Sequence, residues 1–182
     1  MEKAYRLGIL VGRFQILHNG HRYMIGKAIE LCDRVDIFVG SSQESGTNKN
    51  PFSYEKREAF LRRVFGDRVE IYPLPDIGVG NNSKWGDYVL ENVKQRFGEY
   101  PDILISGKEE RRVEWFDRKD LAISELYVPK MIDISATQMR EMLAENDFEN
   151  WKRYADERLW NDFPFMRDVI LATKGNLKTS SM

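Results

Sequence analysis

Short apolar runs alternate with helical patterns of apolar and polar positions over most of this chain. The runs that we expect to form strands are rich in branched apolar residues and comprise Leu7–Val11, Val35–Gly40, Val69–Leu74, Ile103–Ser106 and a weaker run at Leu126–Val128. The stretches that we expect to form helices cover residues 21–33, 54–65, 84–97 and 110–118. This alternation predicts βαβ units, and therefore a parallel sheet whose crossover connections are right-handed.

The pattern changes near residue 134, after which the chain reads as helical to the C-terminal end. Ser135 and Gln138 have the spacing of a capping box, and Ile134 and Met139 lie where a hydrophobic staple would close around it. A helix is therefore predicted to begin directly after Ser135. Pro164 is expected to interrupt the helical pattern further along, because proline removes a backbone donor.

Composition narrows the class of protein without identifying it. The 182 residues carry a net charge of −1, with 42% apolar and 31% charged residues, and we find no repeat, linker or low-complexity run. A chain of this size is predicted to be a single domain, residues 1–182, of which about 134–176 form a C-terminal helical part. The near-neutral charge argues against general binding to nucleic acids or membrane surfaces, which usually requires a basic excess.

Cys32 is the only cysteine, so the chain cannot form an internal disulfide. It lies at the end of an apolar helical pattern, and we expect it to pack in the core rather than to act as a nucleophile or zinc ligand. We recognise neither a signal peptide nor a long apolar run. Together with the cysteine count, this predicts a reducing, cytoplasmic location.

Both histidines of the chain, His18 and His21, fall in one stretch, GILVGRFQILHNGH at residues 8–21. This stretch reads as a strand, a turn and the start of a helix at His21. In an open parallel sheet, the connection from a strand to the following helix lies at the carboxyl edge of the sheet, where ligands bind. The N–H groups of a starting helix attract anions, Arg13 adds a positive charge, and Gly20 allows close approach of the backbone. The stretch therefore predicts a phosphate site.

The alternative is an ordinary glycine-containing turn between a strand and a helix, which many α/β proteins have without any function there. A single histidine in such a turn would fit that alternative. H-x-G-H shortly after G-R-F-Q is far more specific, and we therefore favour the functional interpretation.

Two polar loops follow predicted strands and so lie at the same edge of the sheet. Residues 41–53 are rich in Ser, Asn and Gly, and residues 73–85 contain Asp76 as their only carboxylate. Trp85 closes the second segment, where its aromatic face would attract a planar cationic ring. The alternatives are a generic polar loop for residues 41–53 and core packing for Trp85.

The H-x-G-H stretch resembles a signature of the nucleotidyltransferase superfamily, whose members join a nucleotide to a phosphate or carboxylate acceptor and release pyrophosphate. ISATQMR at residues 134–140 is similar to the second signature of that superfamily, I-S-x-T-x-x-R. GSSQESGTNKNPFSYEKR at residues 40–57 and PLPDIG at residues 73–78 resemble the archaeal-type nicotinamide-mononucleotide adenylyltransferases. The resemblance covers nearly the whole chain.

This resemblance implies an α/β fold, with a Rossmann-like open parallel sheet, helices on both of its faces and a C-terminal helical segment. It implies transfer of AMP from ATP to nicotinamide mononucleotide by in-line attack, to give NAD and pyrophosphate. The residues that it implies as catalytic are His18, His21 and Arg140. Those implied to bind ATP are Gly12, Arg13, Phe14, Ser106, Gly107, Ser135, Thr137 and Arg140. Those implied to bind the acceptor nucleotide are Gln43, Asn50, Asp76 and Trp85.

Mg²⁺ is expected to accompany ATP without a dedicated site in the protein, because this ion keeps several waters and takes phosphate oxygens as ligands. The resemblance also implies a homo-oligomer. Two alternatives stay open: another adenylyl- or cytidylyltransferase, with pantetheine phosphate or glycerol phosphate as acceptor, and a non-catalytic nucleotide sensor. The choice between nicotinamide and nicotinate mononucleotide, the need for a separate partner domain and the roles of Lys108 and Arg111 are also open.

Overall fold

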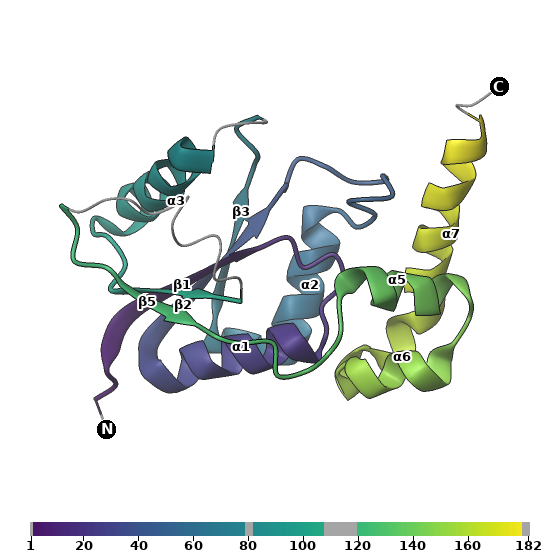
Figure 1. Ribbon diagram of the computed structural model, residues 1–182, viewed down its shortest axis with the longest axis horizontal. Helices are drawn as coiled ribbons and strands as arrows, with labels where there is room; N and C mark the ends of the chain where they lie inside the picture. The colour runs from purple at the N-terminus through teal and green to yellow at the C-terminus, as the bar shows by residue number, and fades with distance from the viewer. Residues whose placement is uncertain (1, 79–81, 108–119, 180–182) are drawn as a thin grey trace.

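The centre of the molecule is a five-stranded sheet in the order β3-β2-β1-β4-β5, in which every neighbouring pair is parallel (Figure 1). The computed structural model describes residues 2–78, 82–107 and 120–179. The strands are β1 (Tyr5–Gly12), β2 (Cys32–Gly40), β3 (Glu70–Leu74), β4 (Ile103–Ser106) and β5 (Ser124–Tyr127). The predicted α/β fold with an open parallel sheet is confirmed.

Helices cover both faces of this sheet. The helices α1 (Asn19–Leu31) and α2 (Tyr54–Phe65) pack on one face, and α3 (Asn82–Phe97) packs on the other (Figure 1). Along β1 the side chains alternate, so that Leu10 belongs to the apolar cluster under α1 and α2, while Ile9 belongs to the cluster under α3. Because both faces are buried, the central strands read as continuous apolar runs.

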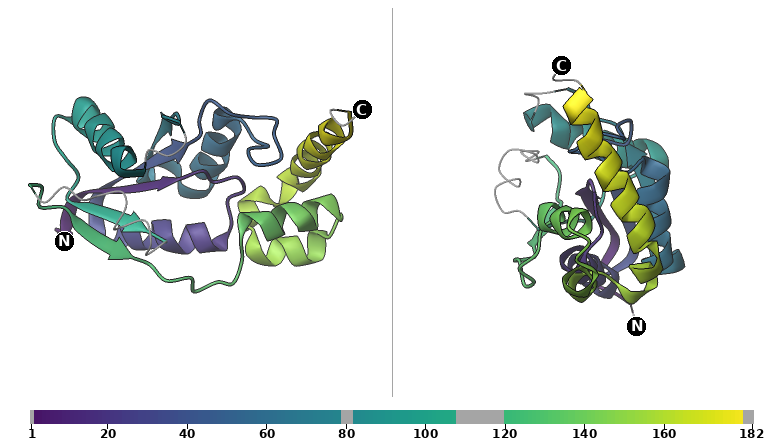
Figure 2. Two further views of the ribbon diagram at one scale, coloured as in Figure 1. Left: turned by 45° about the horizontal axis from the view of Figure 1, so that its top comes forward. Right: turned by 90° about the vertical axis from the view of Figure 1, so that its right-hand side faces the viewer.

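The C-terminal helices α5 (Ala136–Ala144), α6 (Phe148–Tyr154) and α7 (Phe163–Thr179) gather beside the sheet, next to the start of α1 (Figure 2). Trp151 of α6 is fully buried, with its ring centroid 5.2 Å from that of Phe163. Both belong to the same apolar cluster as α1 and α2, so the C-terminal segment shares a core with the sheet. A membrane-spanning helix needs about 20 apolar residues, and no described helix meets that requirement.

Every predicted strand and helix that falls within the described residues is present, but most bounds differ by one to three residues, and α1 begins at Asn19 instead of His21. α2 and β4 have the predicted bounds, whereas β5 lies slightly earlier than the predicted run at 126–128. Cys32 is buried as expected, but it begins β2 instead of ending α1, because its backbone is already extended with φ −118° and ψ 138°. Among the described residues, two short 3-10 helices, η1 (Gly66–Arg68) and η2 (Glu157–Asp162), precede β3 and α7.

Pro164 does not interrupt a helix, which corrects the prediction made for it. It is the second residue of α7, in the first turn, where a missing backbone N–H costs nothing because no helical acceptor is available there. The helix predicted at 110–118 lies outside the described residues.

Gly8 in β1 leaves no room for a side chain. A Cβ at this position would overlap the Cys32 sulfur and lie 3.2 Å from Ile105 Cδ1. We therefore expect Gly8→Ala to lower the free energy of unfolding by about 1–3 kcal/mol. Gly26 in α1 has open space around it, so Gly26→Ala should raise the free energy of unfolding by about 0.5–1 kcal/mol. Urea denaturation measures both changes, and changes of the same sign would contradict the packing argument.

Candidate active site

The site begins where β1 ends and the chain turns into α1. His18 is the N-cap of α1, with φ −138° and ψ 169°, and its carbonyl accepts the first helical hydrogen bond from Arg22 N–H at 3.0 Å. The His18 side chain does not cap the helix. The earlier N–H groups of the first turn therefore have no helical acceptor, and such a helix start favours an anion.

His18 and His21 stack on one another at this helix start. Their ring centroids are 3.8 Å apart, with 28° between the planes. Residues three apart share a helix face, so the H-x-G-H spacing brings the imidazoles together. Gly20 makes room for the stack, because a Cβ there would lie 3.0 Å from His18 Nδ1.

Both imidazoles are neutral at neutral pH. Burial lowers the pKa of His18 to about 4, and the positive charge of Lys130 adds to this effect. Burial also lowers the pKa of His21 well below its usual range, with His18 as the second cause. Nδ1 of each ring is buried and has no hydrogen-bond partner among the described residues. The pair therefore lies in an environment that disfavours its charged form.

Phe14 closes the turn between β1 and the histidines in an unusual backbone conformation. Its φ is 50°, which costs of the order of 1–3 kcal/mol for a bulky residue. Its ring is buried and lies with its centroid 5.0 Å from that of His21. A Cβ on Gly12 would come within 3.0 Å of the same ring. The strain is thus offset by burial of the Phe14 ring against the histidine pair.

The N-terminus of α5 forms the second half of the site. Ser135 Oγ accepts the N–H of Gln138 at 3.2 Å, which confirms the predicted cap. The reciprocal contact differs from a standard capping box, because Gln138 Oε1 accepts the Ser135 hydroxyl at 2.8 Å.

Arg140 joins the two signature stretches. Its Nη1 donates to the carbonyl of Gln15 at 2.9 Å, and its Nη2 donates to Thr137 Oγ1 at 3.2 Å. Burial lowers the pKa of Arg140, and the charge of Arg13, which lines the same pocket, adds to this effect. The N-termini of α1 and α5 therefore line the same pocket.

Arg57 ties together the loops that follow β1 and β2. Its side chain is buried, and it donates to the carbonyls of Arg13 at 2.9 Å, Gly40 at 2.7 Å and Ser41 at 3.0 Å. Burial, helped by the charge of Arg13, lowers the pKa of Arg57 to about 10, so the group stays charged at neutral pH. Its charge is shared among backbone oxygens, which fixes the positions of two strand ends.

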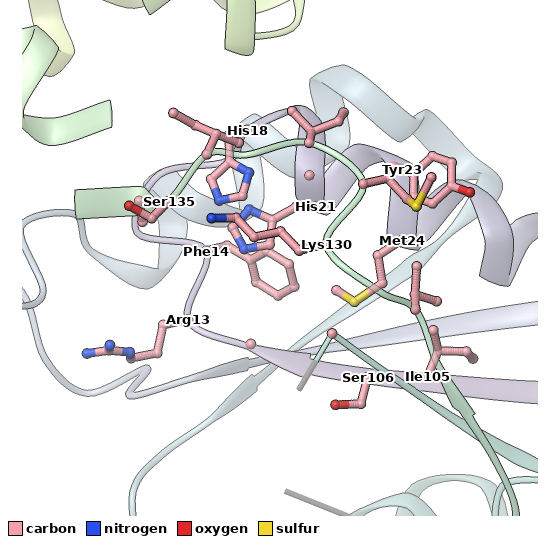
Figure 3. Close-up of a pocket in the computed structure, with 18 of the residues that line it drawn as sticks. Arg13, Phe14, His18, His21, Tyr23, Met24, Ile105, Ser106, Lys130 and Ser135 are labelled. Atoms are coloured by element: carbon pink, nitrogen blue, oxygen red, sulfur yellow. The ribbon is translucent and has the colours of Figure 1, made fainter. Parts of the chain in front are cut away.

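These elements surround a pocket of about 460 Å³ (Figure 3). The predicted site residues that line it are Gly12, Arg13, Phe14, His18, His21, Ser106, Gly107, Ser135 and Arg140. Thr137 is not in the lining but is bonded to Arg140. No described lining residue is an Asp or Glu, so the pocket is suited to a polyanion.

Lys130 and the apolar part of the pocket were not predicted from the sequence. Lys130 lies between β5 and α5, and its side chain extends toward the two histidine rings (Figure 3). Tyr23, Met24 and Ile105 line the pocket on another side. Lys130 could have been predicted to lie near the site, because it follows a predicted strand and so falls at the carboxyl edge of the sheet. Met24 could have been predicted because it lies three residues after His21 and therefore on the same face of the helix.

The residues predicted to bind the acceptor nucleotide lie outside the lining of this pocket. Gln43 Nε2 donates to Asp76 Oδ2 at 3.2 Å, and Gln43 Oε1 accepts the Asp76 N–H at 3.0 Å. The structure therefore brings Gln43 and Asp76 together, across the loops that follow β2 and β3.

Asn50 and Trp85 have contacts of their own. Asn50 is buried, and it braces its loop by bonding to Glu44 and to Thr47 Oγ1. Trp85 is half-buried in α3, with its ring centroid 5.4 Å from that of Tyr88. Lys108 and Arg111 lie outside the described residues.

Several solved structures share this fold. A bifunctional NMN adenylyltransferase/ADP ribose pyrophosphatase from Francisella tularensis, complexed with AMP and a manganese ion, matches 93% of this chain with a TM-score of 0.69 and 24% identity. This chain spans only 52% of that protein. A putative nicotinate-nucleotide adenylyltransferase from Vibrio parahaemolyticus matches 91% of this chain and 99% of its own, with a TM-score of 0.61 and 15% identity.

Curated relatives are more similar in sequence. The nicotinamide-nucleotide adenylyltransferase of Thermococcus onnurineus is 33% identical over 145 residues, which cover 77% of this chain and 73% of the relative. The protein of the same name from Saccharolobus solfataricus is 41% identical over 88 residues, which cover 45% of this chain and 50% of the relative. The cytidylyltransferase-like family model matches residues 9–142, a range that includes both helix starts and the pocket between them. The chain therefore belongs to the cytidylyltransferase-like family of nucleotidyltransferases.

Proposed function

We propose that this chain transfers AMP from ATP to nicotinamide mononucleotide and releases pyrophosphate, which gives NAD. The observation that carries the proposal is the junction of the two signature stretches at one pocket, where Arg140 bonds to the Gln15 carbonyl beside the stacked histidines. The names of the similar curated relatives support the same reaction.

The pocket suggests how ATP lies. We place the base against the apolar side formed by Met24 and Ile105, with Ser106 and Gly107 near the adenosine. The triphosphate then extends past the histidine pair toward Arg13 and Arg140, whose forked donors suit phosphate oxygens. The two helix starts add N–H groups and favourable dipoles at the same place.

The reaction needs positioning more than acid–base chemistry. An oxygen of the acceptor phosphate attacks the α-phosphorus of ATP in line, and the bond from that phosphorus to the bridging oxygen breaks. The bonding electrons leave with pyrophosphate. A phosphate monoester has a second pKa of about 6, so the attacking group is already mostly ionised at neutral pH. A general base is not required, and catalysis depends on orientation and charge stabilisation.

His18 and His21 would donate hydrogen bonds to the phosphate oxygens on which negative charge grows. As neutral rings, each has one N–H to donate, and burial removes competing water from it. Removal of one such donor from a preorganised site typically slows a reaction by about 10²–10³-fold.

Mg²⁺ is proposed to arrive with ATP. The described residues contain no group of three or more His, Cys, Asp or Glu side chains that could hold a metal ion. Phosphate oxygens and waters satisfy Mg²⁺ without a protein cage, so this donor set fits an ion carried by the nucleotide. The ion would neutralise part of the triphosphate charge.

Gln43, Asp76 and Trp85 are proposed to hold the acceptor nucleotide. Asn50, whose own side chain is buried, is proposed to support it by bracing the loop that carries Gln43. Gln43 already fixes Asp76, and Trp85 offers an aromatic face to a cationic pyridine ring. The Asp76 carboxylate would repel the acid group of nicotinate mononucleotide, which favours the amide form.

An acceptor panel tests the proposed reaction. Purified protein with ATP and Mg²⁺ receives nicotinamide mononucleotide, nicotinate mononucleotide, phosphopantetheine or flavin mononucleotide, one at a time, and pyrophosphate release is followed. Glycerol 3-phosphate with CTP completes the panel. We expect release with nicotinamide mononucleotide. Release only with a non-pyridine acceptor would reassign the substrate, and ATP binding without release from any acceptor would indicate a nucleotide sensor.

His18→Ala should abolish most turnover. We expect kcat to fall about 10²–10³-fold because a donor to the reacting phosphates is lost. His18→Gln, whose amide can donate from a similar position, should recover part of the activity. Steady-state kinetics give the result, and circular dichroism checks that both variants are folded. Near-normal turnover of a folded His18→Ala protein would remove His18 from the mechanism.

ATP binding at pH 6 should be accompanied by proton uptake. The free His18 ring, with a pKa of about 4, is almost fully neutral at that pH. Bound phosphates favour the charged ring and so raise this pKa toward the working pH. Calorimetric titration in buffers of different ionisation enthalpy measures the uptake in the wild type and in His18→Gln. Protonation of ATP itself cancels in the difference, and equal uptake by both proteins would contradict protonation of His18 on ATP binding.

A further inference from the structure

Lys130 is a pocket residue that neither signature stretch contains. The cations that line the pocket are Arg13, Arg140 and Lys130, and no described lining residue is a carboxylate. Arg13 and Arg140 come from the two signatures, whereas Lys130 comes from the segment that links β5 to α5. This segment crosses over the helix start that carries the histidines (Figure 3).

The position of Lys130 within the pocket is specific. In the view of Figure 3, Arg13 and Ser135 lie on one side of the histidine pair, and Met24 and Tyr23 lie on the other. The Lys130 side chain extends to the pair itself. Its charge is also the second cause, after burial, of the lowered pKa of His18. Lys130 therefore lies between the cationic side and the apolar side.

Lys130 forms an ion pair with the exposed carboxylate of Asp133. Lys130 Nζ lies 2.6 Å from Asp133 Oδ1, with the two side chains 55% and 95% exposed. Ion pairs this exposed contribute little to stability and are screened by salt. Asp133 can therefore yield Lys130 to a triphosphate at little cost, since a triphosphate carries more negative charge in total than one carboxylate.

We infer that Lys130 binds the pyrophosphate group at the oxygen that bridges the α- and β-phosphates of ATP. This inference rests on the proposed function and on the ATP orientation that goes with it. With the base on the apolar side and the terminal phosphates at the arginines, the bridging oxygen lies over the histidine pair, within reach of Lys130. As the bond from the α-phosphorus to this oxygen breaks, the electron pair moves onto the oxygen. The ammonium of Lys130 then stabilises the new charge, and no proton transfer is needed.

Lys130→Met tests this role, because it keeps most of the length of the side chain and removes the ammonium group. We expect kcat to fall about 10–100-fold, less than for a rigid buried donor. We also expect the Kd for inorganic pyrophosphate, measured by calorimetry, to rise by about tenfold, as for loss of one charge-assisted contact. Lys130→Arg keeps the charge and should restore both quantities to within a few-fold of the wild type.

Lys152→Met is the matched control. Lys152 Nζ also pairs with a carboxylate three residues away, Glu149 at 2.6 Å, but on α6 and outside the pocket lining. It should leave kcat and pyrophosphate affinity unchanged. Unchanged kcat and pyrophosphate affinity in Lys130→Met, or equal losses in Lys152→Met, would overturn the inference.

Calorimetry separates this inference from the proposed reaction. If the wild type releases no pyrophosphate with any acceptor, the proposed reaction fails. Pyrophosphate binding still tests the proposed role of Lys130, because the binding measurement requires no acceptor and no turnover. Weaker binding by Lys130→Met, with Lys130→Arg and Lys152→Met near the wild type, would then support the contact on its own.

Discussion

The buried guanidinium of Arg57 is the constraint on which the site depends. Parallel strands end with carbonyl groups that need donors, and the loops after β1 and β2 leave three of them near one another. Arg57 satisfies the carbonyls of Arg13, Gly40 and Ser41 from one rigid fork. Because a buried donor that loses its acceptors pays a full desolvation penalty, this arrangement holds the two loops in one position. The turn that carries Arg13 and Phe14 is therefore fixed before any ligand binds.

Gln15 likewise fixes separate parts of the site through hydrogen bonds to backbone groups. Its side chain exchanges two hydrogen bonds of 3.0 Å with the backbone of Phe52, and its own carbonyl accepts Arg140. Three segments that are distant in sequence thus meet at one residue: the turn after β1, the loop after β2 and the start of α5. The site is positioned by backbone bonds to buried side chains, while the groups that face the pocket stay available for ligands. Preorganisation of this kind is what charge stabilisation in catalysis requires.

Local patterns predicted most of the fold and the phosphate side of the pocket. The apolar runs located the strands, the Ser135 cap located the start of α5, and H-x-G-H located the histidine stack. Contacts between distant segments could not be predicted this way, since no local pattern shows that Arg140 reaches Gln15 or that Lys130 crosses over His18. The effect predicted for Pro164 was wrong because proline interrupts a helix at an interior position but is well tolerated in the first turn. The residue alone does not show which of these positions it occupies. The acceptor residues stay predictions, because Gln43 and Asp76 meet away from the described pocket.

The absence of carboxylates from the described pocket lining also affects the stability of the folded chain. Arg13 and Arg140 repel one another, and two imidazoles are buried without partners for Nδ1 among the described residues. A nucleotide that relieves this repulsion stabilises the folded chain in proportion to the logarithm of its concentration. The unfolded fraction, and with it exposure to proteases, then rises when nucleotides are scarce. With a nucleotide bound as proposed, the pocket would link the abundance of the protein to the supply of its own ligand.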